Sequence, residues 1–221
     1  LHEVTLRMEH VKIRYGSRTI LKDWIGKSRT GEVALFGPNG AGKSTLLSWF
    51  TRIIPSRMRI RVLFDRKRGS GESIWDIKKR IGYVSPEMHL YYKENVPTLN
   101  IVGSGFFDSI GLFRKCNAEQ ETVALEWMKV FGIEHLKDRL FLTLSSGEQR
   151  LALLARAFVK DPDLIILDEP LHGLDVSNKK KAAAIIEQFC DHPGKTLIYV
   201  THYPHELPAC VDKRFELVKH A

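Results

Sequence analysis

A glycine-rich run holds the residues with the clearest chemical role in this sequence: residues 37–45 read GPNGAGKST. The run follows an expected strand and opens an expected helix, which is the setting that a phosphate-binding loop requires. Its glycines let successive backbone N–H groups turn toward a phosphate, and the helix N-terminus adds partial positive charge. We therefore expect a nucleoside triphosphate to bind here, through Gly37, Pro38, Asn39, Gly40, Ala41, Gly42, Lys43, Ser44 and Thr45.

Four residues are expected to carry the chemistry. Lys43 reaches the β- and γ-phosphates, and the hydroxyl of Ser44 holds Mg²⁺. A second motif, LIILDEP at residues 164–170, buries a strand and delivers Asp168 to its end, where the carboxylate supports Mg²⁺ through coordinated water. Glu169 is placed to polarise an attacking water. Together these motifs predict hydrolysis of a phosphoanhydride, with Ser44 and Asp168 as the metal ligands.

The elements that position these residues alternate between strands and helices. Apolar runs and period-two alternation predict strands, 3.6-residue periodicity predicts helices, and Asn117 with Gln120 predicts a helix-capping box. We expect an α/β fold with a parallel sheet covered on both faces. The expected strands are residues 4–15, 32–36, 59–64, 81–84, 164–167 and 196–200, and the expected helices are residues 43–54, 74–80, parts of 100–130, and 177–189.

Composition sets further bounds on function. The sequence has 43% hydrophobic residues and no run near the roughly 18 apolar residues that a membrane span needs. Its net charge of +8 is concentrated between residues 52 and 80, which leaves nucleic acid and a plain solvated face as alternative interpretations. Lys179, with the two lysines after it, is interpreted as part of a solvated helix face. Cysteines 116, 190 and 210 match no zinc spacing and are interpreted as reduced packing residues.

The stretch from residue 142 to 170, LTLSSGEQRLALLARAFVKDPDLIILDEP, resembles the signature motif and catalytic strand of the ABC ATPases. LSSGE stands in the place of the family's LSGGQ, so the resemblance implies signature residues Ser145, Ser146, Gly147 and Glu148. It also implies a P-loop NTPase fold with a mainly parallel core sheet, an antiparallel β subdomain and an inserted α-helical subdomain at about residues 97–157. Residues 1–221 would then form a single ABC ATPase domain, one half of a longer tandem protein.

Three more residues match the pattern of that family. Tyr15 corresponds to the aromatic ring that stacks on adenine, with edge-strand packing as the alternative. Asp175 in the run HGLD resembles the D-loop. His202 resembles the switch histidine, so the resemblance implies that it contacts the γ-phosphate and joins Glu169 and Lys43 as a catalytic residue.

The resemblance also implies that two cores pair head to tail with ATP between them. Ser145 and Gly147 of one core would then act on the nucleotide of the other. Serine in place of glycine at Ser146, and glutamate in place of glutamine at Glu148, are expected to weaken these contacts.

Pro86 occupies the position at which ABC transporters carry a glutamine, and proline has neither a side-chain amide nor an N–H. Glu87 beside it is a candidate substitute. The run IGYVSPEMHLYY at 81–92, with NIVGSGFFDSIGLF at 100–113 and PACVDKRFELV at 208–218, is similar to the ModF and photorepair-protein branch of the ABC ATPases.

That branch implies the ATP-binding component of an ABC transporter, related to molybdate transport, with ATP and Mg²⁺ as cofactors. Its expected partners are a second ABC domain and membrane permease subunits, in the cytoplasm at the inner membrane face. Two alternatives stay open. One is a soluble ABC ATPase acting on nucleic acid or ribosomes, and the other is a nucleotide-gated interaction module.

Overall fold

Two sheets organise the chain in the computed structural model, which describes residues 4–15, 18–29, 33–36, 60–64, 79–92, 95–107, 114–211 and 213–216. Side chains are described for residues 79–92, 95–107 and 114–211. The expected phosphate-binding loop at 37–45 and the expected helix at 43–54 lie outside these ranges, as does most of the expected helix at 74–80.

The first sheet is antiparallel and has the order β2-β1-β4. Its strands are β1 (Val4–Tyr15), β2 (Arg18–Arg29) and β4 (Ile60–Phe64). The strands predicted at 4–15 and 59–64 are confirmed, and β4 lies at an edge of the sheet as its charged alternation suggested. The sequence analysis missed β2, because its polar and apolar residues come in pairs and do not alternate singly.

The second sheet is parallel throughout and has the order β5-β6-β7-β3-β8. Its strands are β3 (Val33–Phe36), β5 (Ile81–Val84), β6 (Leu164–Asp168), β7 (Thr196–Thr201) and β8 (Lys213–Glu216). Every residue of β6 and β7 is buried, as expected for central parallel strands covered on both faces. The two sheets together give the predicted α/β class.

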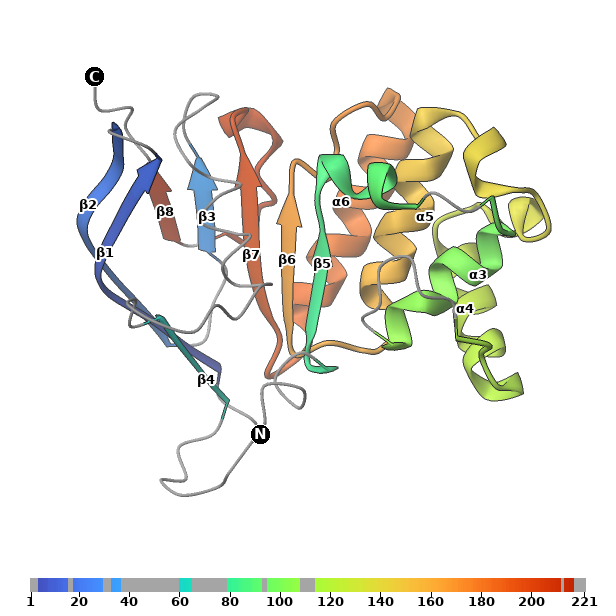
Figure 1. Cartoon of the computed structure of the whole chain (residues 1–221), viewed down its shortest axis with the longest axis horizontal. Coiled ribbons are helices and arrows are strands. Elements are labelled where there is room, and N and C mark those ends of the chain that lie inside the picture. Colours follow the sequence, from blue (N-terminus) through green and yellow to red (C-terminus); the bar gives the residue numbers. More distant parts are fainter. Residues whose placement is uncertain are drawn as a thin grey trace.

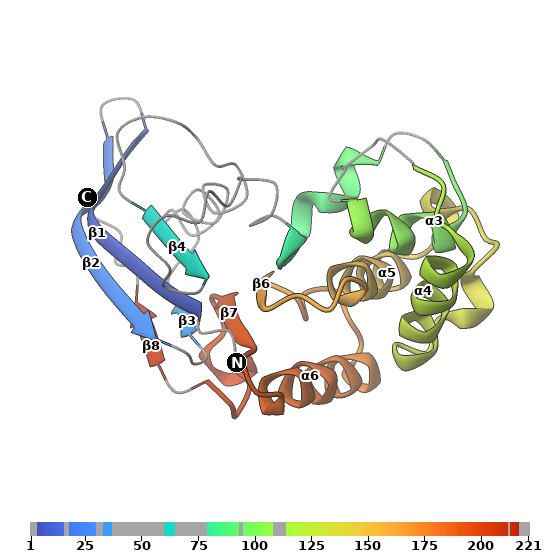
Figure 2. The same cartoon turned by 90° about the horizontal axis from the view of Figure 1, so that it is seen from below.

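Helices α3 (Thr98–Gly103), α4 (Ala118–Val130), α5 (Ser146–Phe158) and α6 (Val176–Asp191) gather at the β5 and β6 end of the parallel sheet. The antiparallel sheet lies at the opposite end, beside β3 and β8, in both views (Figures 1 and 2). The capping box predicted at the start of α4 is confirmed, since Asn117 Oδ1 accepts from the Gln120 N–H at 2.8 Å.

Aromatic packing fixes the helices against one another. Phe158 of α5 stacks on Trp127 of α4 with ring centroids 5.0 Å apart, and it meets Phe189 of α6 edge-on at 5.6 Å. On the sheet side, a Cβ added at Gly82 of β5 would lie 2.3 Å from the carbonyl oxygen of Ala157, so strand and helix approach at backbone distance. Helix α5 is therefore held in a fixed orientation, which positions its N-terminus.

Candidate active site

Two neighbouring parallel strands bring polar side chains together at one edge of the sheet. Asp168 is the last residue of β6 and pairs with Val200 of β7, one residue before the end of that strand. Glu169 follows β6 directly and His202 follows β7. The carboxyl ends of adjacent parallel strands are where α/β folds place their ligands.

The carboxylate of Glu169 is held by the backbone and side chain of His202 and by Thr201. Its Oε1 atom lies 2.6 Å from Nδ1 of His202 and accepts the His202 backbone N–H at 2.9 Å. Its Oε2 atom accepts the Thr201 hydroxyl at 3.2 Å. The side chains of Glu169 and His202 are 11% and 23% exposed, so this contact is largely shielded from solvent. The structure thus brings two predicted catalytic residues into direct contact.

The backbone at Glu169 adopts an unusual conformation that aims its side chain. Its φ is 47°, in the left-handed region that costs a residue with a Cβ about 1–2 kcal/mol. A hydrogen bond from the Glu169 N–H to the Val200 carbonyl, at 2.8 Å, holds the turn against β7. Strain at a residue with a predicted chemical role is a pattern typical of active sites.

This geometry determines which atoms remain available for chemistry. An ionised carboxylate only accepts hydrogen bonds, so Nδ1 of His202 carries the proton in its contact with Glu169. Nε2 of His202 is then the nitrogen left for a ligand. The carboxylate can act as a general base toward a water molecule, while the oriented imidazole supplies a polar contact beside it.

Asp168 fits the role of a metal ligand. It is 2% exposed, and carboxylate oxygens are ligands that Mg²⁺ prefers. Burial raises the pKa of the nearby Tyr83 to about 12, and the charge of Asp168 adds to that rise. Within the part of the chain that the structure describes, no group of three or more His, Cys, Asp or Glu residues could hold a metal. Mg²⁺ is usually held by one or two carboxylates together with substrate phosphates. Ser44, the other expected ligand, lies outside the described residues.

Arg150 is a residue near this site that the sequence analysis missed. It lies on α5, is only 8% exposed, and its Nη1 atom has no hydrogen-bond partner among the described residues. Burial lowers the pKa of Arg150, and the charges of Asp168 and Glu169 oppose that shift. A Cβ at Gly147, one helical turn earlier, would sit 3.6 Å from the carbonyl oxygen of Gly173. The start of α5 therefore packs on the loop that follows Glu169. In the sequence, an arginine next to an apolar helix face was the signal that could have revealed Arg150.

The signature residues form the N-terminus of α5. Ser145 is the N-cap: its hydroxyl accepts the Glu148 N–H at 3.3 Å, and its own N–H donates to the Glu148 carboxylate at 2.8 Å. That backbone hydrogen bond from Ser145 is the main reason that the pKa of Glu148 is lowered. Glu148 thus has a capping role that the sequence analysis did not foresee. Ser145 and Ser146 are exposed, while Gly147 is half-buried.

The remaining candidate residues have simpler surroundings. Asp175 is the N-cap of α6 and accepts the Asn178 N–H at 2.8 Å. Tyr15 ends β1, and its side chain lies outside those described. Pro86 begins the short 3₁₀ helix η1 (Pro86–Tyr91), and Glu87 beside it is exposed.

The helix face interpreted as solvated is exposed at the two lysines that follow Lys179. The side chain of Lys179 is 38% exposed, and its Nζ atom lies 2.7 Å from Oε1 of Glu206. Most of the basic cluster at residues 52–80 lies outside the side chains that the structure describes.

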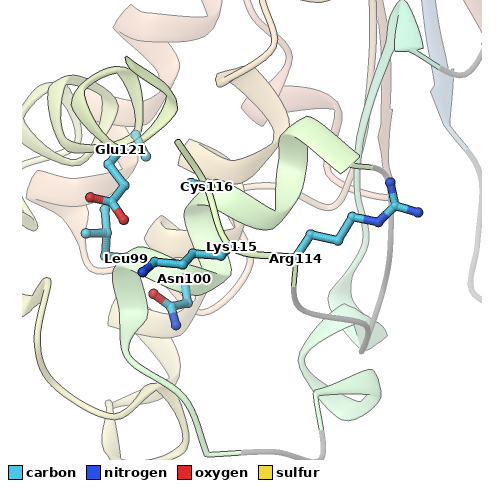
Figure 3. Close-up of a pocket in the computed structure, with 7 residues that line it drawn as sticks. Leu99, Asn100, Arg114, Lys115, Cys116 and Glu121 are labelled. Carbon is cyan, nitrogen blue, oxygen red and sulfur yellow. The ribbon is translucent and has the colours of Figure 1, made fainter. Parts of the chain in front are cut away.

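A separate cavity of about 310 Å³ lies on the helical side of the molecule (Figure 3). Its lining comes from α3, α4 and the segment between them, with no residue from β6 or β7. Arg114 points away from the other labelled side chains, so the charges around the cavity do not converge on one point. The lining residues are Leu99, Asn100, Arg114, Lys115, Cys116, Glu121 and Ala124.

Comparison with known proteins decides the family. Residues 26–172 match the family model described as "ABC transporter". The chain belongs to the ABC transporter family. Among the described residues of this ABC chain, no helix is long and apolar enough to cross a membrane.

Individual relatives agree with this assignment. The ABC transporter ATP-binding protein ModF of Escherichia coli is 43% identical over 93% of this ABC chain, which confirms the predicted ModF-like branch. The chain spans 43% of the length of ModF. YlmA of Bacillus subtilis, an ABC transporter ATP-binding protein, is 32% identical over 94% of the chain and 80% of its own length. The solved structure of cbiO1 from Clostridium perfringens, part of the ABC transporter complex cbiONQ, aligns with TM-score 0.73 and 26% identity over 98% of this chain and 86% of its own.

Proposed function

We propose that this chain hydrolyses ATP to ADP and phosphate, with Mg²⁺, as the ATP-binding component of an ABC transporter. The direct contact between Glu169 and His202 carries this proposal, because it joins a general base to a second polar group at the ligand-binding edge of the sheet. Lys43 and the amides of residues 37–45 bind the phosphates, and Tyr15 stacks on the adenine.

Each residue at the sheet edge has one task in this proposal. Glu169 accepts a proton from the attacking water, and His202 contacts the γ-phosphate through Nε2. Asp168 and Ser44 hold Mg²⁺, which neutralises charge on the β- and γ-phosphates when it is bound. Because Nδ1 of His202 is bonded to Glu169, Nε2 is the atom available to the nucleotide, and the two side chains act on it as one unit in this proposal.

A second ABC core completes the site in this proposal, either in another copy of the chain or elsewhere in the same protein. The exposed N-terminus of α5 supports it, since N–H groups and the positive end of a helix attract phosphate. Ser145 and Gly147 would meet the nucleotide of the opposing core. The Ser145 N–H already donates to Glu148, so the phosphate contact falls to the Ser145 hydroxyl and to the amides that follow it.

The decisive experiment measures phosphate release by the full-length protein and its Glu169→Gln variant, together with size-exclusion runs in ATP and Mg²⁺. We expect the wild type to release phosphate and the variant to bind ATP, lose turnover and accumulate an ATP-dependent dimer or closed tandem. If both proteins bind ATP and neither turns it over with candidate partners present, the hydrolysis proposal fails and the nucleotide-gated module replaces it.

The cargo is a separate question. The resemblance to ModF suggests a molybdate-related role, whereas another relative, AdcC of Streptococcus pneumoniae, is named a zinc transport protein at 29% identity. Co-purification of the full-length protein with a polytopic membrane protein would support the transporter role. A phosphate-release rate that rises with one added oxyanion or metal would then identify the cargo.

One observation favours a different output. Pro86 starts a 3₁₀ helix whose Met88 is buried in the core, and it offers no amide for the contact that transporters make at this position. A soluble ABC ATPase acting on nucleic acid or ribosomes fits this substitution and the net charge of +8. Retention on RNA or DNA that falls steeply with salt, without any membrane partner, would select this second function.

A further inference from the structure

The segment that follows His202 lies along helix α6 and is bonded to it at several points. We call residues 203–210 the strap. Nζ of Lys179 lies 2.7 Å from Oε1 of Glu206, and the Ala209 N–H donates to Oε1 of Glu187 at 3.1 Å. The strap thus contacts α6 through an ion pair and a backbone hydrogen bond.

A third contact joins two cysteines. Sγ of Cys210, at the end of the strap, lies 2.8 Å from Sγ of Cys190 in the last turn of α6. Lys179 and Cys190 are eleven residues apart, close to three full helical turns, so they lie on nearly the same face of α6 and about 16 Å apart along its axis. The strap therefore spans most of the length of the helix.

The two sulfur atoms lie close to each other. A disulfide has its sulfur atoms about 2.05 Å apart, so the observed pair needs only a small approach. Both side chains are half-buried, which leaves them open to a small oxidant. Cys116 differs, because burial raises the pKa of its thiol and it lies beside the cavity between α3 and α4.

We propose that Cys190 and Cys210 are a redox modification site whose disulfide restrains the segment carrying His202. The oxidant is a low-molecular-weight disulfide. The thiolate of one cysteine attacks it and expels one small thiol, and the second cysteine then displaces the other small thiol from the mixed disulfide. In total, two protein thiols lose two protons and two electrons, and one small disulfide becomes two small thiols.

The bond closes a covalent ring that contains His202. The chain from Cys190 to Cys210 includes β7, Thr201 and His202, so the disulfide would tie the far end of this segment to the C-terminal turn of α6. Resting on the proposed hydrolysis, in which His202 contacts the nucleotide, the disulfide slows turnover because it restrains the segment that carries His202.

The test treats the full-length protein with oxidised glutathione, and then maps disulfides by mass spectrometry of unreduced peptides. Matched samples carry Cys190→Ser, Cys210→Ser or, as the control, Cys116→Ser. We expect one linked peptide pair, Cys190 with Cys210, in the wild type and the control. We also expect kcat for phosphate release to fall about tenfold in those two samples and to recover with dithiothreitol.

The outcomes separate the modification from the proposed hydrolysis. If the reduced wild type releases no phosphate, the hydrolysis proposal fails. Amide hydrogen exchange across residues 203–211 still tests the disulfide, because slower exchange upon oxidation shows that the bond restrains this segment. The redox site is overturned if no Cys190 to Cys210 link forms, or if the link forms and alters neither turnover nor exchange. It is also overturned if both serine variants lose activity to oxidation as the wild type does.

Discussion

His202 and Glu169 meet through a single carboxylate oxygen. Oε1 of Glu169 receives both the Nδ1 contact at 2.6 Å and the His202 backbone N–H at 2.9 Å, whereas among the described residues Oε2 receives only the Thr201 hydroxyl at 3.2 Å. The two oxygens therefore differ in how much free lone-pair capacity they retain. Oε2 is the oxygen that we expect to accept a proton from water.

Replacing His202 by alanine tests the pairing. We expect kcat to fall by about 10²–10⁴-fold, because the nucleotide loses a contact and the carboxylate loses its orienting partner. In the double variant with Glu169→Gln, the total fall in kcat should be much smaller than the product of the two single-variant falls, since residues that act as a unit are non-additive. Single-turnover phosphate release measures all three variants. Independent, multiplying losses would contradict a shared role.

Thr201→Val tests the weaker hydrogen bond. The substitution removes the donor to Oε2 of Glu169 and the acceptor for the Tyr203 N–H, at 3.0 Å. We expect a loss of about 1–2 kcal/mol in unfolding free energy and a clear fall in kcat. Thr201→Ser keeps the hydroxyl and serves as the control. In denaturant unfolding and in phosphate release, the serine variant should behave nearly as the wild type does. A serine variant as impaired as the valine variant would contradict the role of the Thr201 hydroxyl.

Arg150→Met tests whether a buried charge supports the carboxylates. Removing the positive charge leaves the surroundings of Asp168 and Glu169 more negative, so less Mg²⁺ should be needed for the half-maximal rate of phosphate release. Thermal stability should stay level or rise, because the variant also removes a buried nitrogen that has no hydrogen-bond partner among the described residues.

Arg150→Lys is the matched control, since it retains the charge. We expect it to restore the wild-type Mg²⁺ dependence in part. If both variants lose stability together and leave the Mg²⁺ dependence unchanged, Arg150 is a packing residue only.

The capping box at the signature predicts a specific dependence on acid. The pKa of Glu148 is lower in the folded chain than its ordinary value of 4.5, mainly through the hydrogen bond from the Ser145 N–H, with help from Arg139 and His135. The capping contribution is therefore complete above the ordinary pKa, and it is lost as pH falls through the lower folded value.

Glu148→Ala should cost about 0.5–1 kcal/mol of unfolding free energy at neutral pH and remove that acid dependence. Glu148→Gln keeps an acceptor for the cap and removes the charge. This variant should be more stable than the alanine variant, and its unfolding free energy should not change with the protonation of residue 148. Denaturant unfolding at pH 3 and pH 7 measures both effects. A glutamine variant as unstable as alanine would contradict the capping role.

Local patterns explain how much of the fold was predictable from the sequence. The capping box of Asn117 and Gln120 and the buried strand ending at Asp168 depend on neighbouring residues, so spacing alone revealed them. Strand β2 lacks a clean period, and its place in the sheet depends on pairing with β1. The cap made by Ser145 and Glu148 has the same S-x-x-E spacing as known capping boxes, but those residues were interpreted only as a nucleotide signature.

Contacts between distant residues explain what the sequence could not reveal at the site. Asp168, Glu169 and His202 were proposed from motifs, but the hydrogen bonds of Glu169 depend on the register of β6 against β7. The closeness of Cys190 to Cys210 likewise arises from the path of the strap along α6. Neither contact leaves a periodic trace in the sequence.

The left-handed backbone at Glu169 has a consequence for how related sequences drift. At a φ of 47°, fold stability alone favours glycine or asparagine over glutamate. If a descendant no longer needed to hydrolyse ATP, replacing this glutamate would not destabilise its backbone. In related sequences, glutamate at this position therefore marks a lineage held to hydrolysis, and glycine or asparagine marks one that has relaxed toward nucleotide binding alone.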